Sequence, residues 1–247
     1  MAFTAAPSFE STRETTNYAR LCRLLVDVGT HVLRETFDNL RPPGALSEVL
    51  VSPPVFSILQ SLRRKRILNP SQWGKLFPAI KHSVSSREFD ITLLMVLLRN
   101  ICNLIPPATG WDILPPPTDK TTVAEIVRIK YYRNTVYGHA NEASVDDVTY
   151  VAYWQDIKYT LERLGGRHYQ YTIDRLETES IDPEYEEHYQ DLLRQWVKDE
   201  ENIKDKLDQI AETLGRMLQD VRESVASRSG VEGKCTMSEQ QCLILKF

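Results

Sequence analysis

Hydrophobic residues recur every three to four positions along most of the chain, which is the period of an amphipathic α-helix. One such pattern covers about residues 18–37 and is followed by Pro-Pro-Gly at 42–44, which is expected to end a helix. Shorter patterns predict helices over 46–51 and 54–66, and the second closes in Arg-Arg-Lys-Arg, where cations complement the helix dipole. No segment alternates like an exposed strand. The predicted class is all-α.

The middle of the chain contains the most apolar helical pattern. The run ITLLMVLL opens a helix predicted for 91–104, with Asp90 as its N-cap. A helix that is apolar nearly all round belongs at the centre of a bundle. Asn69-Pro70 precedes it and begins a segment that we interpret as a connector.

Two capped helices follow. The sequence Thr122-Val123-Ala124-Glu125 has the spacing of a capping box, and the pattern that it begins runs to Tyr137. Gly138 then predicts a left-handed residue just past the helix end. A further helix is expected to begin within 144–147 and to end at Gly165-Gly166, with an apolar stripe of Val148, Val151, Trp154, Ile157, Leu161 and Leu164.

The last pattern begins at Asp182-Pro183 and extends to about residue 227. Its apolar positions alternate spacings of four and three, like a heptad seam: Ile203, Leu207, Ile210, Leu214, Met217 and Val221. Such a stripe forms a coiled coil with a partner helix or packs back on the bundle. The predicted organisation is a flexible N-terminus (1–13), a helical domain (14–182), a long helix whose first turns pack on the bundle (183–227) and a flexible tail (228–247).

The composition is that of an ordinary soluble globular chain, with 42% hydrophobic and 26% charged residues. The four cysteines stand singly, and Cys22 and Cys102 fall within helical patterns as small core residues. We therefore expect a reduced, cytoplasmic compartment. The apolar run 91–98 is too short to span a bilayer, and residues 1–11 lack a signal-peptide pattern, so no membrane association is expected.

Charge is distributed unevenly along the chain, whose net charge is −4. Residues 1–140 contain 17 Lys and Arg against 11 Asp and Glu, whereas residues 141–247 contain 13 against 23. The first part could meet an anionic partner, and the second could not. The histidines and cysteines lack metal-ligand spacing, and no phosphate-binding glycine motif occurs, so neither a metal nor a cofactor is expected.

Arg133 is unusual on physical grounds. Helical spacing puts it on the same face as Ile126, Ile129 and Val136, in the middle of an apolar stripe. A buried arginine costs stability unless it is paired or faces a crevice. It is either a structural residue, satisfied by a carboxylate such as Asp146 or Asp147, or part of a site. His139 follows the expected helix end, where the chain can turn it back toward Arg133.

The segment RIKYYRNTVYGHA at 128–140 resembles the R-x4–6-H signature of HEPN domains, in the version found in the DAZ-interacting zinc-finger ubiquitin ligase and its invertebrate and fish relatives. A polar residue commonly follows the arginine in that motif, and Asn134 holds this position. Further similar segments occur in the expected order: 18–21, 68–73, 89–94, 98–102, 110–112 and 164–166. The resemblance covers roughly residues 14–198.

The resemblance implies a helical bundle that dimerises, with the two motifs facing each other across a shared cleft. In catalytic HEPN proteins this arrangement is a metal-independent endoribonuclease. His139 would then transfer protons at the ribose 2′-OH or the leaving 5′-oxygen, because imidazole titrates near neutral pH. Arg133 would stabilise the phosphorane and Asn134 would orient the histidine or the phosphate. Phosphate contacts and base stacking would come from Arg128, Lys130, Tyr132 and Tyr137.

Two function classes remain open from the sequence. The first is a ribonuclease or RNA-binding module that acts as a homodimer through Arg133, Asn134 and His139. The second is a non-catalytic adaptor or oligomerisation module in an innate-immune or RNA-associated assembly, whose partners include other signalling-protein modules. The motif favours the first class. The overall acidity and the heptad pattern favour the second, because a nuclease normally presents a more basic surface to phosphates.

Overall fold

The structure is a computed structural model that describes residues 12–140, 142–181 and 187–199, together with 201, 205, 216 and 219. Within these residues the regular elements are helices and no strand occurs, which confirms the predicted all-α class. The chain divides into two compact units, residues 1–203 and 204–247. The heptad positions, the expected boundaries at 182 and 228 and the expected tail lie outside the described residues.

The first predicted helix is a longer composite of three pieces. Helix α1 (Arg13–Arg23) leads through a π-helical turn, η1 (Leu24–Gly29), into α2 (Thr30–Leu40). The backbone at both junctions stays right-handed helical, so the pattern of buried residues continues across them. Its predicted apolar positions are buried in the core: Tyr18, Leu21, Leu24, Leu25, Val28 and Val32.

Three short helices follow. They are α3 (Leu46–Val51), α4 (Pro53–Arg64) and α5 (Pro70–Leu76), with single 3-10 turns η2 (Pro43–Ala45), η3 (Lys81–Ser83) and η4 (Ser86–Glu88) around them. The prediction of a connector after Asn69 was wrong, because this segment forms α5. Asn69 accepts a hydrogen bond from the Gln72 backbone, and the Gln72 side chain accepts one from the Asn69 backbone. This capping box specifies a helix too short to show a clear hydrophobic period.

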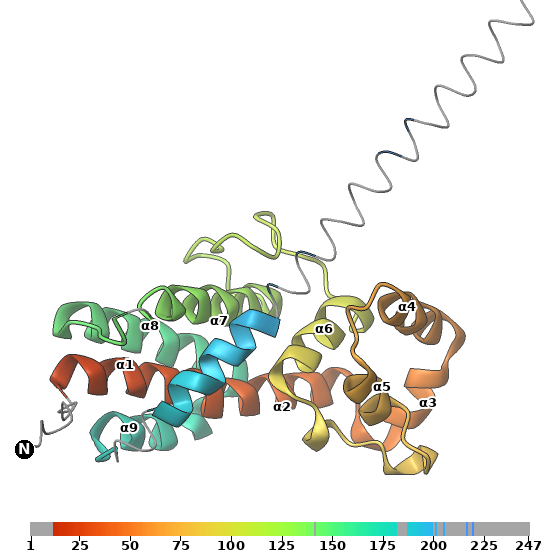
Figure 1. Ribbon diagram of the computed structural model, residues 1–247, viewed down its shortest axis with the longest axis horizontal. Helices are drawn as coiled ribbons and strands as arrows, with labels where there is room; N and C mark the ends of the chain where they lie inside the picture. The colour runs from red at the N-terminus through yellow and green to blue at the C-terminus, as the bar shows by residue number, and fades with distance from the viewer. Residues whose placement is uncertain are drawn as a thin grey trace, which may run out of the picture. The chain divides into compact units, whose positions relative to one another are not determined.

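Helix α6 (Ile91–Ile101) is largely buried, as its apolar run predicted, but it packs against α2 and α4 at one side of the bundle and not at its centre (Figure 1). The Asp90 side chain accepts from the Leu93 backbone N–H at 2.8 Å, which confirms its role as N-cap. The helix ends three residues earlier than predicted, because Asn103 adopts a left-handed backbone conformation with φ 55°. Cys22 and Cys102 are buried free thiols, as expected, and burial raises the pKa of the Cys102 thiol to about 11.

Helices α7 (Thr122–Tyr137) and α8 (Asp147–Gly165) pack along each other, and both contact α1 (Figure 1). The chain then forms η5 (Arg167–Tyr169) and α9 (Gln170–Thr178), which the sequence analysis did not predict. Helical residues 187–199, drawn in blue, cross in front of the bundle (Figure 1). The Tyr189 hydroxyl donates to the Asp27 carboxylate at 2.8 Å, which anchors this segment to η1.

Three expectations about α7 and α8 were wrong. The N-cap of α7 is Thr121, whose hydroxyl accepts from the Ala124 backbone, because Glu125 is occupied by ion pairs inside the fold. Gly138 is right-handed, with φ −55°, since the backbone continues in tight turns past the helix end. Val148 and Val151 are exposed, because α8 turns Tyr150 and Trp154 inward instead.

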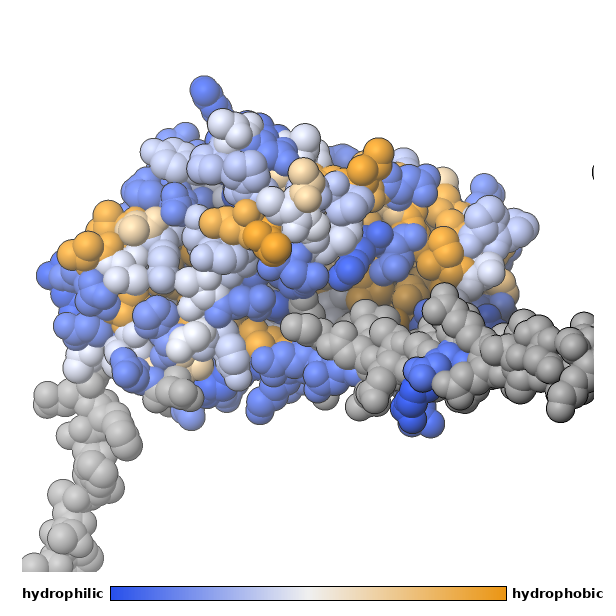
Figure 2. Space-filling view, turned by 90° about the horizontal axis from the view of Figure 1, so that it is seen from above, coloured by the Kyte–Doolittle hydropathy of each residue, from blue (hydrophilic) through white to orange (hydrophobic). Residues whose placement is uncertain are grey.

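The described surface mixes hydrophilic residues with separate hydrophobic patches, as Figure 2 shows from above. Among the described residues no single helix is long and apolar enough to cross a bilayer. Helices α3 and α4 together meet the criterion of length and composition, although the pair is bent by 73° at its break.

Gly165 provides a test of the packing between α8 and α2. A Cβ added there would lie 2.7 Å from Val32 Cγ2 and 2.8 Å from the Tyr169 ring, whereas one added at Gly74 in α5 would meet nothing within 4 Å. Gly165→Ala should therefore lower the free energy of unfolding by about 1–3 kcal/mol through overpacking. Gly74→Ala should raise it by about 0.5–1 kcal/mol through helix propensity. Urea denaturation measures both, and equal shifts would contradict the packing described here.

Candidate active site at the end of helix α7

Arg133 is among the largest fully buried side chains of the described structure, with 1% exposure. Its guanidinium stacks on the Trp196 ring, with 4.8 Å between the guanidinium carbon and the ring centroid. Its Nε and Nη2 atoms donate to Asn134 Oδ1 at 3.0 and 2.6 Å. The expected burial of Arg133 is thereby confirmed. Segment 187–199 covers the arginine from outside the bundle.

The carboxylates considered as partners of Arg133 have other roles. Asp146 caps α8 by accepting from the Val148 and Thr149 backbone N–H groups, each at 3.0 Å. Hydrogen bonds from Thr149 hold the pKa of Asp146 below its usual range. Asp147 pairs with Arg13 at 2.9 Å. Both carboxylates therefore fix the start of α8, next to the motif.

The described ring contact of His139 is with a different helix from the one that Arg133 contacts. It is half-buried, and its ring lies edge-on to Tyr153 of α8, with 6.2 Å between centroids. The His139 backbone N–H donates to the Val136 carbonyl at 3.0 Å, so the chain keeps winding and does not reverse after Gly138. Arg133 thus contacts the segment 187–199 and His139 contacts α8. Their described contacts do not join the two motif residues within one chain.

Asn134 and Lys130 lie on the accessible side of α7. Asn134 is exposed, and it lines a shallow depression with Trp111, Asp112, Val127, Lys130 and Tyr131. Lys130 Nζ lies 2.6 Å from Asp112 Oδ1, which links the helix to the loop before it. Tyr137 is half-buried. This side of α7 therefore presents polar groups in a hollow that is too small to enclose a nucleotide.

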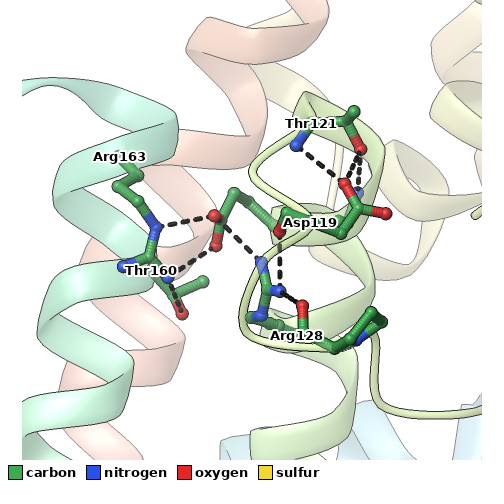
Figure 3. A network of polar contacts seen from close by, with 8 residues as sticks. Asp119, Thr121, Arg128, Thr160 and Arg163 are labelled. Atoms are coloured by element: carbon green, nitrogen blue, oxygen red, sulfur yellow. Dashed lines mark hydrogen bonds and ion pairs between the residues drawn. The ribbon is translucent and has the colours of Figure 1, made fainter.

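Arg128 belongs to a buried polar network that Figure 3 shows from close by. Its Nη1 pairs with Glu125 at 2.9 Å, and its Nη2 donates to the Pro116 and Asp119 carbonyls at 2.6 and 2.7 Å. Glu125 also accepts from Arg163 of α8 at 2.6 and 3.0 Å (Figure 3), which raises the pKa of the Arg163 guanidinium. The network binds α7, α8 and the preceding loop together. The expected phosphate contact of Arg128 is therefore blocked in this structure.

The Tyr132 side chain also forms its contacts inside the fold. Its hydroxyl donates to Asp156 of α8 at 2.9 Å, and its ring packs near Tyr153. Burial and this hydrogen bond raise the pKa of the Tyr132 phenol well above its usual range. Only 8% of its surface is exposed, so base stacking on its ring is excluded in this structure.

The sequence analysis missed three residues that define this region. Glu125 was assigned to a capping box, although its spacing of three from Arg128 is that of an ion pair on a helix. Trp196 and Tyr153 carry no local signal, because each meets the motif only through packing between segments distant in the chain. Within the described ranges, no three His, Cys, Asp or Glu side chains are grouped as a metal site would require.

Glu125→Gln tests the buried network. The change leaves Arg128 without its charged partner in a site where both side chains are at most 5% exposed. Breaking a buried ion pair from one side costs about 3–5 kcal/mol. Arg13→Gln, which breaks the exposed pair with Asp147, should cost less than about 1 kcal/mol. Urea denaturation followed by circular dichroism compares the two, and a similar small loss in both would contradict a structural role for Glu125.

Comparison with known proteins agrees with the described fold. Residues 43–189 match the family described as DZIP3/hRUL138-like HEPN. The chain is similar to the E3 ubiquitin-protein ligase DZIP3 of Mus musculus, with 26% identity over 178 residues, and to that of Homo sapiens, with 29% over 168 residues. Each alignment covers 67% of this chain but 14% of the relative. No solved structure matches. The all-helical architecture and the family match agree, and the chain belongs to the DZIP3/hRUL138-like HEPN family.

Proposed function

We propose that this chain is a non-catalytic HEPN interaction module that self-associates, and that its R-x5-H motif is a structural element. The burial of Arg133 beneath Trp196 carries the proposal. The proposal concerns the HEPN part alone, because the chain corresponds to 14% of the length of the ubiquitin ligases that it resembles.

The chemistry of RNA cleavage needs a guanidinium that reaches a phosphate. Arg133 is 1% exposed, and two of its donors bond Asn134 Oδ1, the side chain expected to orient the phosphate or the histidine. The His139 ring packs edge-on against Tyr153 of α8. Arg128 and Tyr132 are hydrogen-bonded inside the fold, so in this structure neither supplies the phosphate contact or base stacking that a nuclease of this type would use.

Self-association is supported by the start of α8. Val148 and Val151 are 81% and 57% exposed and occupy one face of the helix at a spacing of three. They follow the motif directly along the chain. A second copy would bring the same two valines to a twofold axis, since a twofold interface uses the same patch on both subunits. We propose this face as the homodimer contact.

Cleavage and stability together test the structural role of Arg133. Wild type, Arg133→Ala and His139→Ala should all fail to cleave RNA in EDTA. Arg133→Ala should also lose about 2 kcal/mol or more of folding stability, because a desolvated cation–π contact disappears. Arg167→Ala, which removes an exposed arginine, is the control for stability. Metal-independent cleavage by the wild type that both motif variants abolish would overturn the proposal.

A ribonuclease is the second candidate, and the accessibility of Asn134 and His139 at one helix end supports it. On this alternative, segment 187–199 would move away from Arg133 and the partner's motif would complete the site. Trp196→Ala separates the candidates. A nuclease held closed by Trp196 should cleave faster in this variant, whereas a structural contact should give a less stable protein without cleavage. The cleavage assay in EDTA measures the first outcome, and thermal melting curves of the same variant measure the second.

Sedimentation velocity tests the proposed dimer contact. Val148→Glu combined with Val151→Glu should convert a dimer to a monomer, because four carboxylates would meet at the twofold axis. Ile80→Glu, at a residue that is 73% exposed on another part of the surface, should leave the dimer intact. A wild-type monomer at high concentration, or a dimer that survives the double change, would sink this assignment.

A further inference from the structure

We propose that the tip formed by the C-terminal end of α4 and by α5 docks on the surface of an anionic lipid bilayer. Four consecutive cations lie there, Arg63, Arg64, Lys65 and Arg66, and all four are exposed. Within the described part of the chain, no carboxylate forms an ion pair with the first three. We call these four residues the basic cluster. It plays no part in the R-x5-H motif, since α4 and α5 lie on the α6 side of the body, away from α8 and α9 (Figure 1).

The charge around the basic cluster is opposite to that of the whole chain. Residues 43–88 contain seven Lys and Arg against two Glu, a net charge of +5, whereas the chain carries −4. A bilayer that contains anionic lipids has a negative surface potential, which attracts clustered Lys and Arg within about a Debye length. The α3–α5 region is therefore the part of this protein that such a surface attracts.

The backbone at the end of α4 keeps the cations together. The helix dipole accounts for Arg63 and Arg64 in the last turn. Arg66 lies beyond the helix in a left-handed conformation with φ 58°, and its N–H donates to the Arg63 carbonyl at 2.9 Å. Glycine is the residue that accepts this conformation without strain. The full run of cations thus exceeds what helix capping needs, and an anionic surface accounts for the excess.

Half-buried aromatic rings lie directly beside the basic cluster. The Arg63 guanidinium stacks on the Trp73 ring at 4.4 Å. The Phe77 centroid lies 4.4 Å from that of Trp73, and Phe56 packs against both rings. Tryptophan is enriched at the level of lipid headgroups, because its ring is apolar and its N–H is polar. The tip therefore presents cations and aromatic surface at the same place.

Ile80 adds an apolar side chain to this tip. It lies three residues beyond Phe77 and is 73% exposed, which makes it the most exposed large apolar residue of segment 43–88. Lys81 follows it and is also exposed, so a cation can stay among the headgroups while the isoleucine enters the interface. Figure 2 shows hydrophobic side chains beside hydrophilic ones over the side of the body where α4 and α6 lie.

The apolar side chains favour a bilayer over a nucleic-acid backbone as the occupant. A phosphodiester backbone would be held by the cations and would leave Ile80 in water. A base could stack on this face of Trp73 only by displacing the Arg63 guanidinium. A bilayer interface takes both kinds of group, since it combines charged headgroups with an apolar boundary below them.

The docking is peripheral, without a segment that crosses the bilayer. The expectation of no membrane association concerned spanning helices and signal peptides, and peripheral binding needs neither. The bent pair of α3 and α4 is committed to the fold, because Leu46, Leu50 and Leu59 are at most 1% exposed. The bilayer contact therefore uses only side chains that the folded protein already exposes.

The test is co-sedimentation of the full chain with vesicles of phosphatidylcholine, with and without phosphatidylserine, at several KCl concentrations. The wild type should bind only the vesicles with phosphatidylserine, and more weakly as KCl rises. Arg63→Gln/Arg64→Gln/Lys65→Gln should weaken this binding at least about tenfold, because each Lys or Arg near an anionic surface contributes several-fold. Ile80→Ser should weaken it about fivefold at unchanged net charge, because the apolar side chain no longer leaves water.

The controls make matched changes elsewhere on the surface. Lys120→Gln/Arg167→Gln/Arg175→Gln removes three exposed cations outside the tip and should change the affinity less than about threefold. Tyr171→Ser, at a residue of α9 that is 75% exposed, should bind as the wild type does. Melting curves check that each variant is folded.

Three outcomes would overturn the proposal. They are a wild type that does not bind vesicles with phosphatidylserine, equal losses in the two triple variants, and an Ile80→Ser variant that binds as tightly as the wild type. Binding to polyuridine that depends on the basic cluster, without binding to vesicles, would identify a nucleic acid as the occupant instead. Arg133→Ala should bind vesicles as the wild type does, which keeps this result separate from the role of the motif.

Discussion

Helix α7 has to bury charge, and the fold is arranged around that requirement. The helix contacts α1, η1 and α8, and it contains Glu125, Arg128 and Arg133, all at most 4% exposed. Charges in such surroundings need partners, since desolvation otherwise outweighs their attraction to anything nearby. Glu125 pairs with Arg163 of α8, and Arg128 donates hydrogen bonds to two carbonyls of the preceding loop. Arg133 is covered by Trp196. Three separate parts of the chain are therefore held by one helix.

This arrangement changes how the R-x5-H motif is interpreted. An arginine in an apolar stripe next to a histidine has the composition of an active site, but the same arginine also satisfies the packing of segment 187–199. The Arg133 guanidinium that a nuclease would need at the phosphate is therefore the same group that holds segment 187–199 in place. A buried cation that stacks on a tryptophan and bonds its neighbour's amide oxygen is a rigid structural contact, and rigidity of that kind suits a recognition module better than a site that must admit a phosphate.

The two ends of the body differ in their electrostatics. The α3–α5 region carries an excess of cations, whereas the helices after residue 140 carry an excess of carboxylates, several of which cap or tie helices, as Asp146 and Asp156 do. The exposed Val148 and Val151 belong to the acidic part of the chain, and the exposed cations of residues 63–66 belong to the basic part.

The sequence by itself determined the features that depend on neighbours within a turn or two of helix. The helical period, the Asp90 cap, the burial of Arg133 and the family motif were all readable, because these signals are local. Tertiary structure alone decided the partners. Trp196 and Arg163 reach α7 from distant segments, and the direction of His139 depends on Tyr153 of another helix. A one-dimensional pattern states that a charge will be buried, but only the packing of the helices decides what satisfies it.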